Sequence, residues 1–224
     1  MEFDAKLVDA LLVTLRVACI ATIVVTPFAL FAGFALARFE FRGKSVVETT
    51  LALPLVLPPT AIGYLLLVLF GRSGPLGEGT LGFDPGVLFT WRGAVLASAV
   101  VSFPLAARTA RAAFEVVDPR LERMARSLGM SRTAVFARVT IPLAGRGLVA
   151  ALALAFGRAL GEFGATVIVA GNIPGRTQTI PLAIFDEIQL GNERGALLLV
   201  GVATALAFVV LYSVERLGRA RVPA

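Results

Sequence analysis

The sequence predicts an all-α integral membrane protein with about five transmembrane helices. Hydrophobic residues make up 57% of its 224 residues and the mean hydropathy is +0.85, both too high for a soluble domain of this size. Charged residues amount to only 16%, and they lie in groups between apolar runs. Several of these runs reach the roughly 20 residues that a helix needs to cross a bilayer.

Five apolar stretches are the expected spans, and with their connections they form one transmembrane domain over residues 8–217. The first stretch contains Arg16 and Pro27, and the proline is a candidate kink. A glycine-rich loop follows the second stretch, and a segment that is part loop and part amphipathic helix follows the fourth. The expected spans cover about 8–37, 46–70, 91–107, 147–170 and 196–212.

The distribution of Lys and Arg predicts the orientation of these spans. More than twice as many basic residues fall on the side that holds the arginine-rich loop (118–143) and the tail (213–224) as on the other side. Because basic residues accumulate in cytoplasmic loops, we expect this loop and the C-terminus in the cytoplasm and the N-terminus outside. Topology then accounts for the net charge of +6, and we expect membrane lipid and no nucleic acid as a partner.

The arginine-rich loop is the longest polar interruption, and its local chemistry predicts two short helices. Asp118 is suited to cap the first helix, with Pro119 in its first position. Gly129 suits the left-handed residue that ends this helix, and Ser131 can cap a second helix that ends before Pro142. The spacing i, i+3, i+4 and i+7 gives one apolar stripe of Leu121, Met124, Ala125 and Leu128. Such a basic amphipathic helix either rests on lipid headgroups or docks into a partner's groove.

The fourth expected span contains two charged residues, Arg158 and Glu162. They are four residues apart, so they lie on one helix face and can pair. Charges inside a membrane are costly and face the interior of a bundle or a water-filled path. The pair is therefore either a structural salt bridge or part of a substrate route. A close-packed helix seam is predicted from Gly157, Gly161 and Gly164.

Prolines interrupt the second expected span. They remove backbone donors, so they predict either a kink or a broken helix whose free carbonyls are buried by protein or line a cavity. Small hydroxyl residues in three spans can contact an oxyanion or bond back to their own helices. The candidate residues of a translocation pathway are thus Pro58, Pro59, Thr60, Ser102, Arg158, Glu162 and Thr166.

The arginine-rich loop resembles the cytoplasmic loop of the membrane subunits of bacterial ABC importers. That loop carries a Glu-Ala-Ala signature, a glycine four residues after the second alanine, and a later Ile-x-Leu-Pro-like close. Ala125 and Gly129 match the second alanine and the glycine, and residues 141–143 resemble the close. Arg123 stands where the glutamate is expected and Met124 where the first alanine is expected.

The acidic residue of the signature is displaced to Glu122 in this sequence. In that family the helix docks on a cytoplasmic ATPase and passes on its nucleotide-driven motion. The resemblance therefore implies ATPase-coupling roles for Asp118, Leu121, Glu122, Arg123, Met124, Ala125, Leu128 and Gly129.

Three further segments, 51–74, 90–108 and 157–189, resemble the permeases of molybdate ABC importers, and the likeness covers about residues 10–217. It implies a type I ABC importer permease fold and a molybdate pathway across the cytoplasmic (inner) membrane. It also implies a homodimer, two ATPase subunits that hold ATP and magnesium, and a periplasmic or lipid-anchored molybdate-binding protein. Permeases for tungstate or sulfate are the alternatives within this class.

The residues exclude several other functions. No phosphate-binding Gly-x4-Gly-Lys-Ser/Thr loop occurs, so ATP must be hydrolysed by another chain. With no histidine and one cysteine, a disulfide framework and histidine-based catalysis or metal binding are excluded, so we expect no enzyme and no bound cofactor. Five helices are too few to enclose a wide polar route, which favours a second copy. An ATP-independent secondary transporter or channel remains an alternative, although we find no internal repeat.

Overall fold

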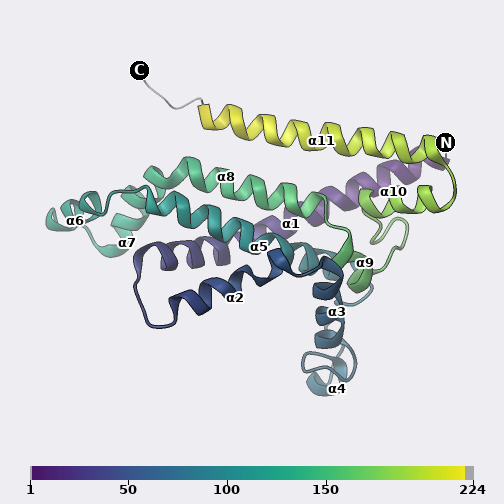
Figure 1. Cartoon of the computed structure of the whole chain (residues 1–224), viewed down its shortest axis with the longest axis horizontal. Coiled ribbons are helices and arrows are strands. Elements are labelled where there is room, and N and C mark those ends of the chain that lie inside the picture. The colour runs from purple at the N-terminus through teal and green to yellow at the C-terminus, as the bar shows by residue number, and fades with distance from the viewer. Residues whose placement is uncertain (1, 220–224) are drawn as a thin grey trace.

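The computed structural model describes residues 2–219, with side chains from Lys6 to Ser213 and that of Arg216. Every regular element in this part of the chain is helical, which confirms the predicted all-α fold. The long helices run along one common axis, and the N-terminus lies at the end that holds α10 (Figure 1).

The chain folds into helices of very different length. Four stretches among the described residues are long and apolar enough to cross a membrane, and α2 with α3 makes a fifth if this pair, bent by 108°, is one broken span. The elements are α1 (Glu2–Arg38), α2 (Lys44–Val56), α3 (Pro59–Phe70), α4 (Glu78–Leu81), α5 (Trp91–Glu115), α6 (Pro119–Ser127), α7 (Arg132–Val135), a π-helical turn η1 (Phe136–Thr140), α8 (Ile141–Leu160), α9 (Gly164–Ala170), α10 (Ile180–Gln189) and α11 (Glu193–Arg219).

Small residues bring the three central helices, α1, α5 and α8, together at backbone distance. Buried alanines from all three share one apolar cluster. A Cβ on Gly33 of α1 would lie 2.8 Å from the backbone nitrogen of Arg111 in α5, and one on Gly147 of α8 would overlap the side chain of Ala113. Close approach of this kind is how membrane helices associate, because lipid provides no hydrophobic drive between them.

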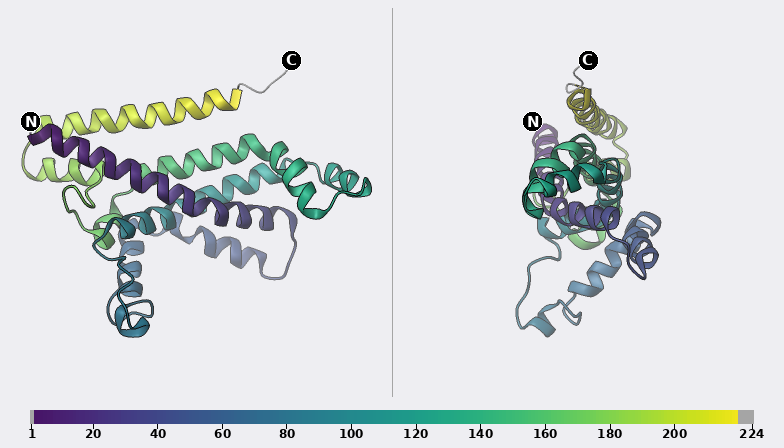
Figure 2. Two further views of the ribbon diagram at one scale, coloured as in Figure 1. Left: turned by 180° about the vertical axis from the view of Figure 1, so that it is seen from behind. Right: turned by 90° about the vertical axis from the view of Figure 1, so that its left-hand side faces the viewer.

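Two parts of the chain lie outside this bundle. α11 packs against α8 and α10 along part of its length, and its Phe208 and Tyr212 remain exposed. α3 and α4 form an arm that projects away from the bundle in each view (Figure 2). Exposed apolar surface of this extent fits lipid or another protein rather than water.

The third span extends to Glu115 and the fifth to Arg219, beyond their expected ends, and the structure also differs from expectation in the arginine-rich loop and in the fourth span. The second helix of the arginine-rich loop does not end before Pro142; α7 continues through η1 into α8, so this prediction is wrong. Pro142 sits in the first turn of α8, and the preceding π-helical turn already departs from the i→i−4 pattern that a proline would interrupt. The fourth span also ends early, at Leu160, and resumes as α9 after a three-residue break.

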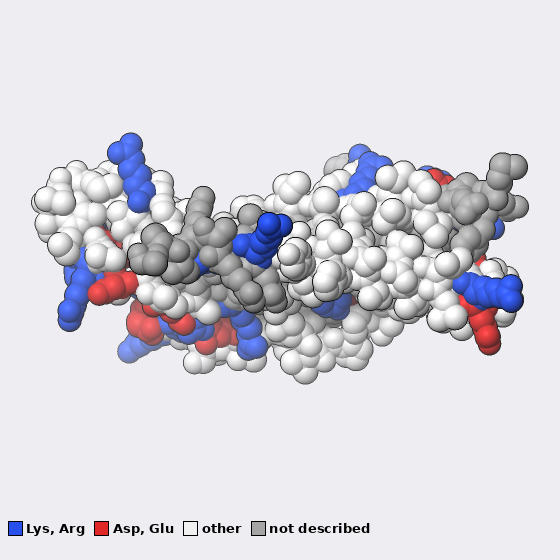
Figure 3. Space-filling view, turned by 90° about the horizontal axis from the view of Figure 1, so that it is seen from above, with Lys and Arg blue, Asp and Glu red and all other residues white. Residues whose placement is uncertain are grey.

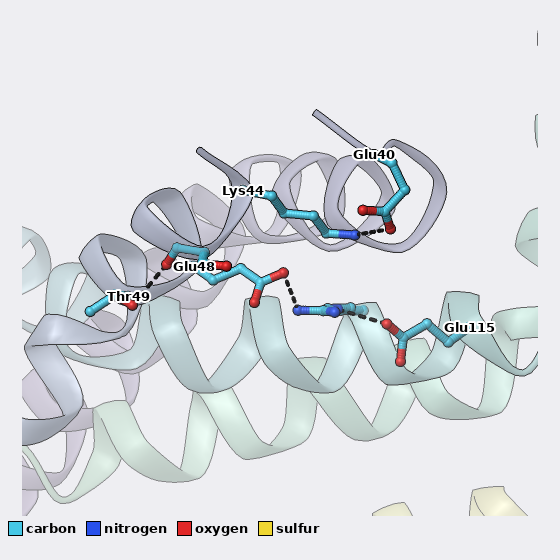
Figure 4. A network of polar contacts seen from close by, with 7 residues as sticks. Glu40, Lys44, Glu48, Thr49 and Glu115 are labelled. Atoms are coloured by element: carbon cyan, nitrogen blue, oxygen red, sulfur yellow. Dashed lines mark hydrogen bonds and ion pairs between the residues drawn. The ribbon is translucent and has the colours of Figure 1, made fainter. Parts of the chain in front are cut away.

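Charged side chains gather at the end of the molecule that holds α6 and α7 (left in Figure 3), and the middle of the visible face is mostly uncharged. One ion pair ties α2, which has no buried residue, to α5 near that end. Arg111 of α5 places Nη1 2.7 Å from Glu48 of α2 and Nε 2.7 Å from Glu115 (Figure 4).

Candidate functional sites

The first candidate site is α6 of the arginine-rich loop, whose two ends form as the sequence predicts. The Asp118 carboxylate accepts a hydrogen bond of 2.8 Å from the backbone N–H of Arg120. Gly129 ends the helix with φ +87°, a conformation that residues with a side chain rarely adopt. Ser131 then caps α7 by accepting from the N–H of Ala134 at 3.2 Å.

The apolar stripe of α6 has no partner for most of its length within the described chain. Leu121 is 44% exposed, Met124 63% and Leu128 85%. Only Ala125 is buried, against the body of the protein. Three large apolar side chains in a row on a short polar helix form a surface that is suited to a groove on another molecule.

Glu122 lies on the side of α6 next to the buried Ala125, and it bonds the helix to two spans. Its Oε1 accepts from Nη2 of Arg38, at the end of α1, at 2.9 Å, and from Oγ1 of Thr140, in η1, at 2.8 Å. The same Arg38 nitrogen also donates to the carbonyl of Val117 at 3.0 Å. Glu122 thus connects α6 to α1 and to η1 through charge-assisted bonds, which are stronger than neutral ones.

The second candidate site is the contact between two broken spans, α2/α3 and α8/α9. A Cβ on Gly63 of α3 would lie 2.9 Å from the carbonyl oxygen of Ala165 in α9, and one on Gly164 would lie 2.9 Å from Cβ of Pro59. The breaks are thus packed against each other without room for side chains. We call this contact the helix junction; it comprises residues 57–63 and 161–168.

The predicted pair between Arg158 and Glu162 forms at the helix junction. Nη1 of Arg158 lies 2.8 Å from Oε2 of Glu162, whose side chain is only 1% exposed. The other carboxylate oxygen, Oε1, accepts a 2.8 Å hydrogen bond from the N–H of Ala165, in the first turn of α9. Both oxygens of the buried carboxylate are therefore satisfied, and it stabilises the start of α9 as an acidic residue does at a helix N-terminus.

The remaining predicted pathway residues are spread over several environments. Thr60 and Pro58 are exposed beside the break in the second span, whereas Ser102 is buried and bonds back to the carbonyl of Ala99 at 3.3 Å. Thr166, in the first turn of α9, is fully buried, and its hydroxyl has no hydrogen-bond partner in the described part of the chain. The second span is broken rather than gently kinked, which decides between the two structures that its prolines allow.

The predicted glycine seam is only partly present. Gly164 packs against the second span, but a Cβ on Gly157 would meet nothing within 4 Å, and one on Gly161 would meet only its own helix. The prediction is therefore wrong for these two glycines within this chain. Sequence reasoning also missed Gly63, which is closely packed, and the two residues that hold Glu122, namely Arg38 and Thr140.

The chain matches known proteins over nearly its whole length. The family model described as "Binding-protein-dependent transport system inner membrane component" matches residues 26–222. The molybdenum transport system permease protein ModB of Escherichia coli (strain K12) is 47% identical over 213 residues, which cover 94% of this chain and 93% of that protein. The putative molybdenum transport system permease protein YvgM of Bacillus subtilis (strain 168) is 42% identical and covers 90% and 89%. The sulfate transport system permease protein CysT of E. coli (strain K12) is 35% identical and covers 96% and 77%.

Solved structures of ABC transporters share the fold. An inward-facing structure of the MetNI methionine ABC transporter matches with a TM-score of 0.75 at 17% identity, over 97% of this chain and 96% of that one. A bacterial ABC transporter involved in the import of the acidic polysaccharide alginate matches with a TM-score of 0.78 at 16% identity, over 97% and 80%. These likenesses show the type I ABC importer permease fold. With the family match over residues 26–222, they place the chain in the family of inner-membrane components of binding-protein-dependent transport systems.

Proposed function

We propose that this chain is the permease subunit of an ABC importer and forms the pathway of molybdate across the inner membrane, with ATP hydrolysed on separate subunits. The substrate assignment rests on a difference in sequence identity. The chain is 47% identical to the molybdenum permease ModB of E. coli and 35% identical to the sulfate permease CysT of the same organism. Tungstate, a tetrahedral oxyanion like molybdate, is the nearest alternative cargo.

The exposed stripe of α6 is the proposed contact with the ATPase subunits, which would also hold the ATP and magnesium. Burying a leucine such as Leu128 in a groove contributes about 1.5–3 kcal/mol, so three large side chains supply a useful part of a docking energy. Glu122 then carries the movement of α6 to α1 and η1, because it bonds to both. Asp118 and Gly129 keep the helix at a fixed length.

The proposed assembly contains two copies of this chain, two ATPases and a periplasmic or lipid-anchored binding protein. The exposed apolar surface of α11, for example at Phe208, supports a second copy, because neither α8 nor α10 covers it. The excess of Lys and Arg beside the arginine-rich loop supports a cytoplasmic position for α6 and the C-terminus, with the N-terminus outside.

The helix junction is the proposed part of the pathway that contacts the oxyanion. Non-helical backbone at membrane depth is tolerated where protein buries it or where it lines a path, and here two such breaks meet. Discontinuous helices of this kind build substrate sites in other transporters. The hydroxyl of Thr166 is fully buried and has no partner, so it would donate to an anion once the two breaks separate.

Reconstitution tests this function. The chain is placed in liposomes with a candidate ATPase and binding protein, and uptake of labelled molybdate, tungstate and sulfate is measured side by side with and without ATP. We expect ATP-dependent uptake with molybdate preferred over sulfate. Uptake that follows the proton gradient and ignores ATP would favour a secondary transporter, and equal rates for sulfate would refute the substrate assignment.

A further inference from the structure

A cavity of about 690 Å³ separates the arginine-rich loop from the end of the first span. It shares Glu122 and Arg123 with α6, but it contains neither the exposed stripe of that helix nor any residue of the helix junction. Three elements form its walls: the end of α1, one face of α6, and the segment from α7 to η1. Its lining includes Phe34, Phe39, Arg123, Arg126, Arg132 and Phe136. We call it the arginine pocket.

Three arginines of the arginine pocket have no ion-pair partner within the described part of the chain. No carboxylate of the described residues lies within ion-pair distance of Arg123, Arg126 or Arg132. The one acidic residue in the lining, Glu122, already accepts bonds from Arg38 and Thr140. Arginines that surround a cavity without acidic partners form a site suited to an anion with several acceptor oxygens.

The two arginines of α6 that line the pocket lie on the face of the helix opposite to its apolar stripe. An α-helix has 3.6 residues per turn, so Arg123 and Arg126 share a face, and that face is turned away from Leu128. A partner that docks on the stripe therefore leaves these two arginines directed into the cavity. Buried Nε of Arg38, on the same wall, also has no hydrogen-bond partner.

The floor of the pocket is apolar and aromatic, which distinguishes it from a site for a small free ion. Phe34 packs edge-on against Phe39, with ring centroids 6.2 Å apart, and against Phe136 at 4.9 Å. Phe39 is 56% exposed and is followed by the exposed apolar residues Phe41 and Val46. Exposed apolar side chains therefore alternate with charged ones in the segment that follows the pocket. A ligand that satisfies both parts has an anionic head and an apolar body.

We propose that the arginine pocket binds an anionic phospholipid, with its phosphodiester on Arg123, Arg126 and Arg132 and its acyl region against the phenylalanines. Basic pockets beside membrane helices bind anionic lipid headgroups in this way. The bound lipid would connect α6 to the end of α1 beside the Glu122–Arg38 pair. This inference rests on the chain being a membrane protein, and not on which oxyanion it carries.

Lipid titration followed by native mass spectrometry tests the proposal on the full chain. The protein is purified in detergent, freed of lipid, and titrated with phosphatidylglycerol, phosphatidylcholine and inorganic phosphate. We expect phosphatidylglycerol to bind on the order of tenfold more tightly than phosphatidylcholine, because only the former carries net negative charge. Because transport is not measured, failure of this experiment and failure of the proposed function are distinguishable.

A matched pair of double variants assigns the binding to the pocket. Arg123→Gln with Arg126→Gln should abolish the preference for phosphatidylglycerol, whereas Arg120→Gln with Arg138→Gln removes the same charge from the same loop outside the pocket and should keep it. Arg132→Gln weakens binding independently, because it reaches the cavity from α7. All of these arginines are exposed, so thermal unfolding should not change.

Four outcomes overturn the proposal. Equal losses in both double variants would show a general effect of charge. Equal affinities for the two lipids would show that the arginines do not select the anionic headgroup. Displacement of phosphatidylglycerol by inorganic phosphate at similar concentration would show that the site binds a free anion. Release of the lipid when a cognate ATPase binds would assign the pocket to the protein interface.

Discussion

The helix junction and the arginine-rich loop are both irregular, but they are held in place by different means. At the junction, glycines bring backbone against backbone, and the single buried carboxylate, Glu162, has both oxygens satisfied within its own segment. In the loop, α6 buries only Ala125 and is attached through Glu122 to residues far away in the sequence. One region is fixed by packing and the other by a few polar bonds.

This difference in attachment fits the expected surroundings of each region, which are the membrane for the helix junction and a partner protein for α6. A broken helix inside a membrane leaves backbone groups without partners, so close protein packing around the break is required. A helix that docks on a partner instead needs a free apolar face and a firm attachment on the other side. Substitutions should therefore act on stability at the junction and on communication between subunits at the loop.

Gly63→Val should have the largest effect on stability. Its Cβ would lie within 3.0 Å of backbone atoms of Ala165, which cannot move aside as a flexible side chain does. We expect a loss of about 3 kcal/mol from overpacking, measured by thermal unfolding in detergent. The matched control is Gly157→Val, also in a helix, where a Cβ meets nothing within 4 Å. Equal losses in both variants would contradict a close-packed junction.

Glu162→Gln should have the next largest effect, because it removes the charge that Arg158 faces. The new amide oxygen can still accept from the N–H of Ala165, so the start of α9 is kept while the ion pair is lost. We expect a stability loss of about 2 kcal/mol, in the range for hydrogen bonds to charged groups, and reduced ATP-driven uptake. Glu78→Gln, at an exposed position at the start of α4, is the control. Unchanged uptake together with unchanged stability would leave the pair no role.

Gly129→Val tests the loop side of the comparison. With φ +87° a β-branched residue is strained by about 1–2 kcal/mol, although no neighbouring atom blocks its Cβ. We expect the chain to insert into membranes normally but to lose ATP-driven uptake. The strained end of α6 would change the position of the apolar stripe that is the proposed contact with the ATPase. Gly129→Asn, which tolerates this conformation, should retain most uptake. Wild-type uptake by the valine variant would argue against α6 as the coupling element.

Local chemistry in the sequence was enough to predict the ends of α6 and the charged pair. Asp118, Gly129 and Ser131 act on neighbours within four residues, so their roles can be read without a fold. The same holds for Arg158 and Glu162, which are one helical turn apart. Hydrophobic runs of sufficient length also predicted the all-helical fold correctly.

Contacts between distant segments could not be predicted in the same way. Arg38 reads as a basic residue at the end of a span, and nothing near it indicates that it binds Glu122, 84 residues later. Gly63 and Gly157 look alike within apolar runs, yet only the former faces another helix. The continuation of α7 into α8 was missed because Pro142 was taken as a stop, whereas it is accommodated in the first turn of a helix.

Arg111→Gln should have the smallest effect of the four substitutions. It tests whether a polar bond, as in the arginine-rich loop, also helps to hold the broken second span at the helix junction. Arg111 of α5 ties α2 to the bundle through its ion pair with Glu48, and its second pair, with Glu115, lies within α5 (Figure 4). α2 leads directly into the helix junction. These groups are about a third exposed or more, so the loss should stay below about 1 kcal/mol. Protease accessibility of the loop before α2 measures whether its attachment loosens, and Arg72→Gln, on a more exposed and longer pair, serves as the control. A loss as large as that of Gly63→Val would mean that polar bonds, and not glycine packing, hold the broken span in place.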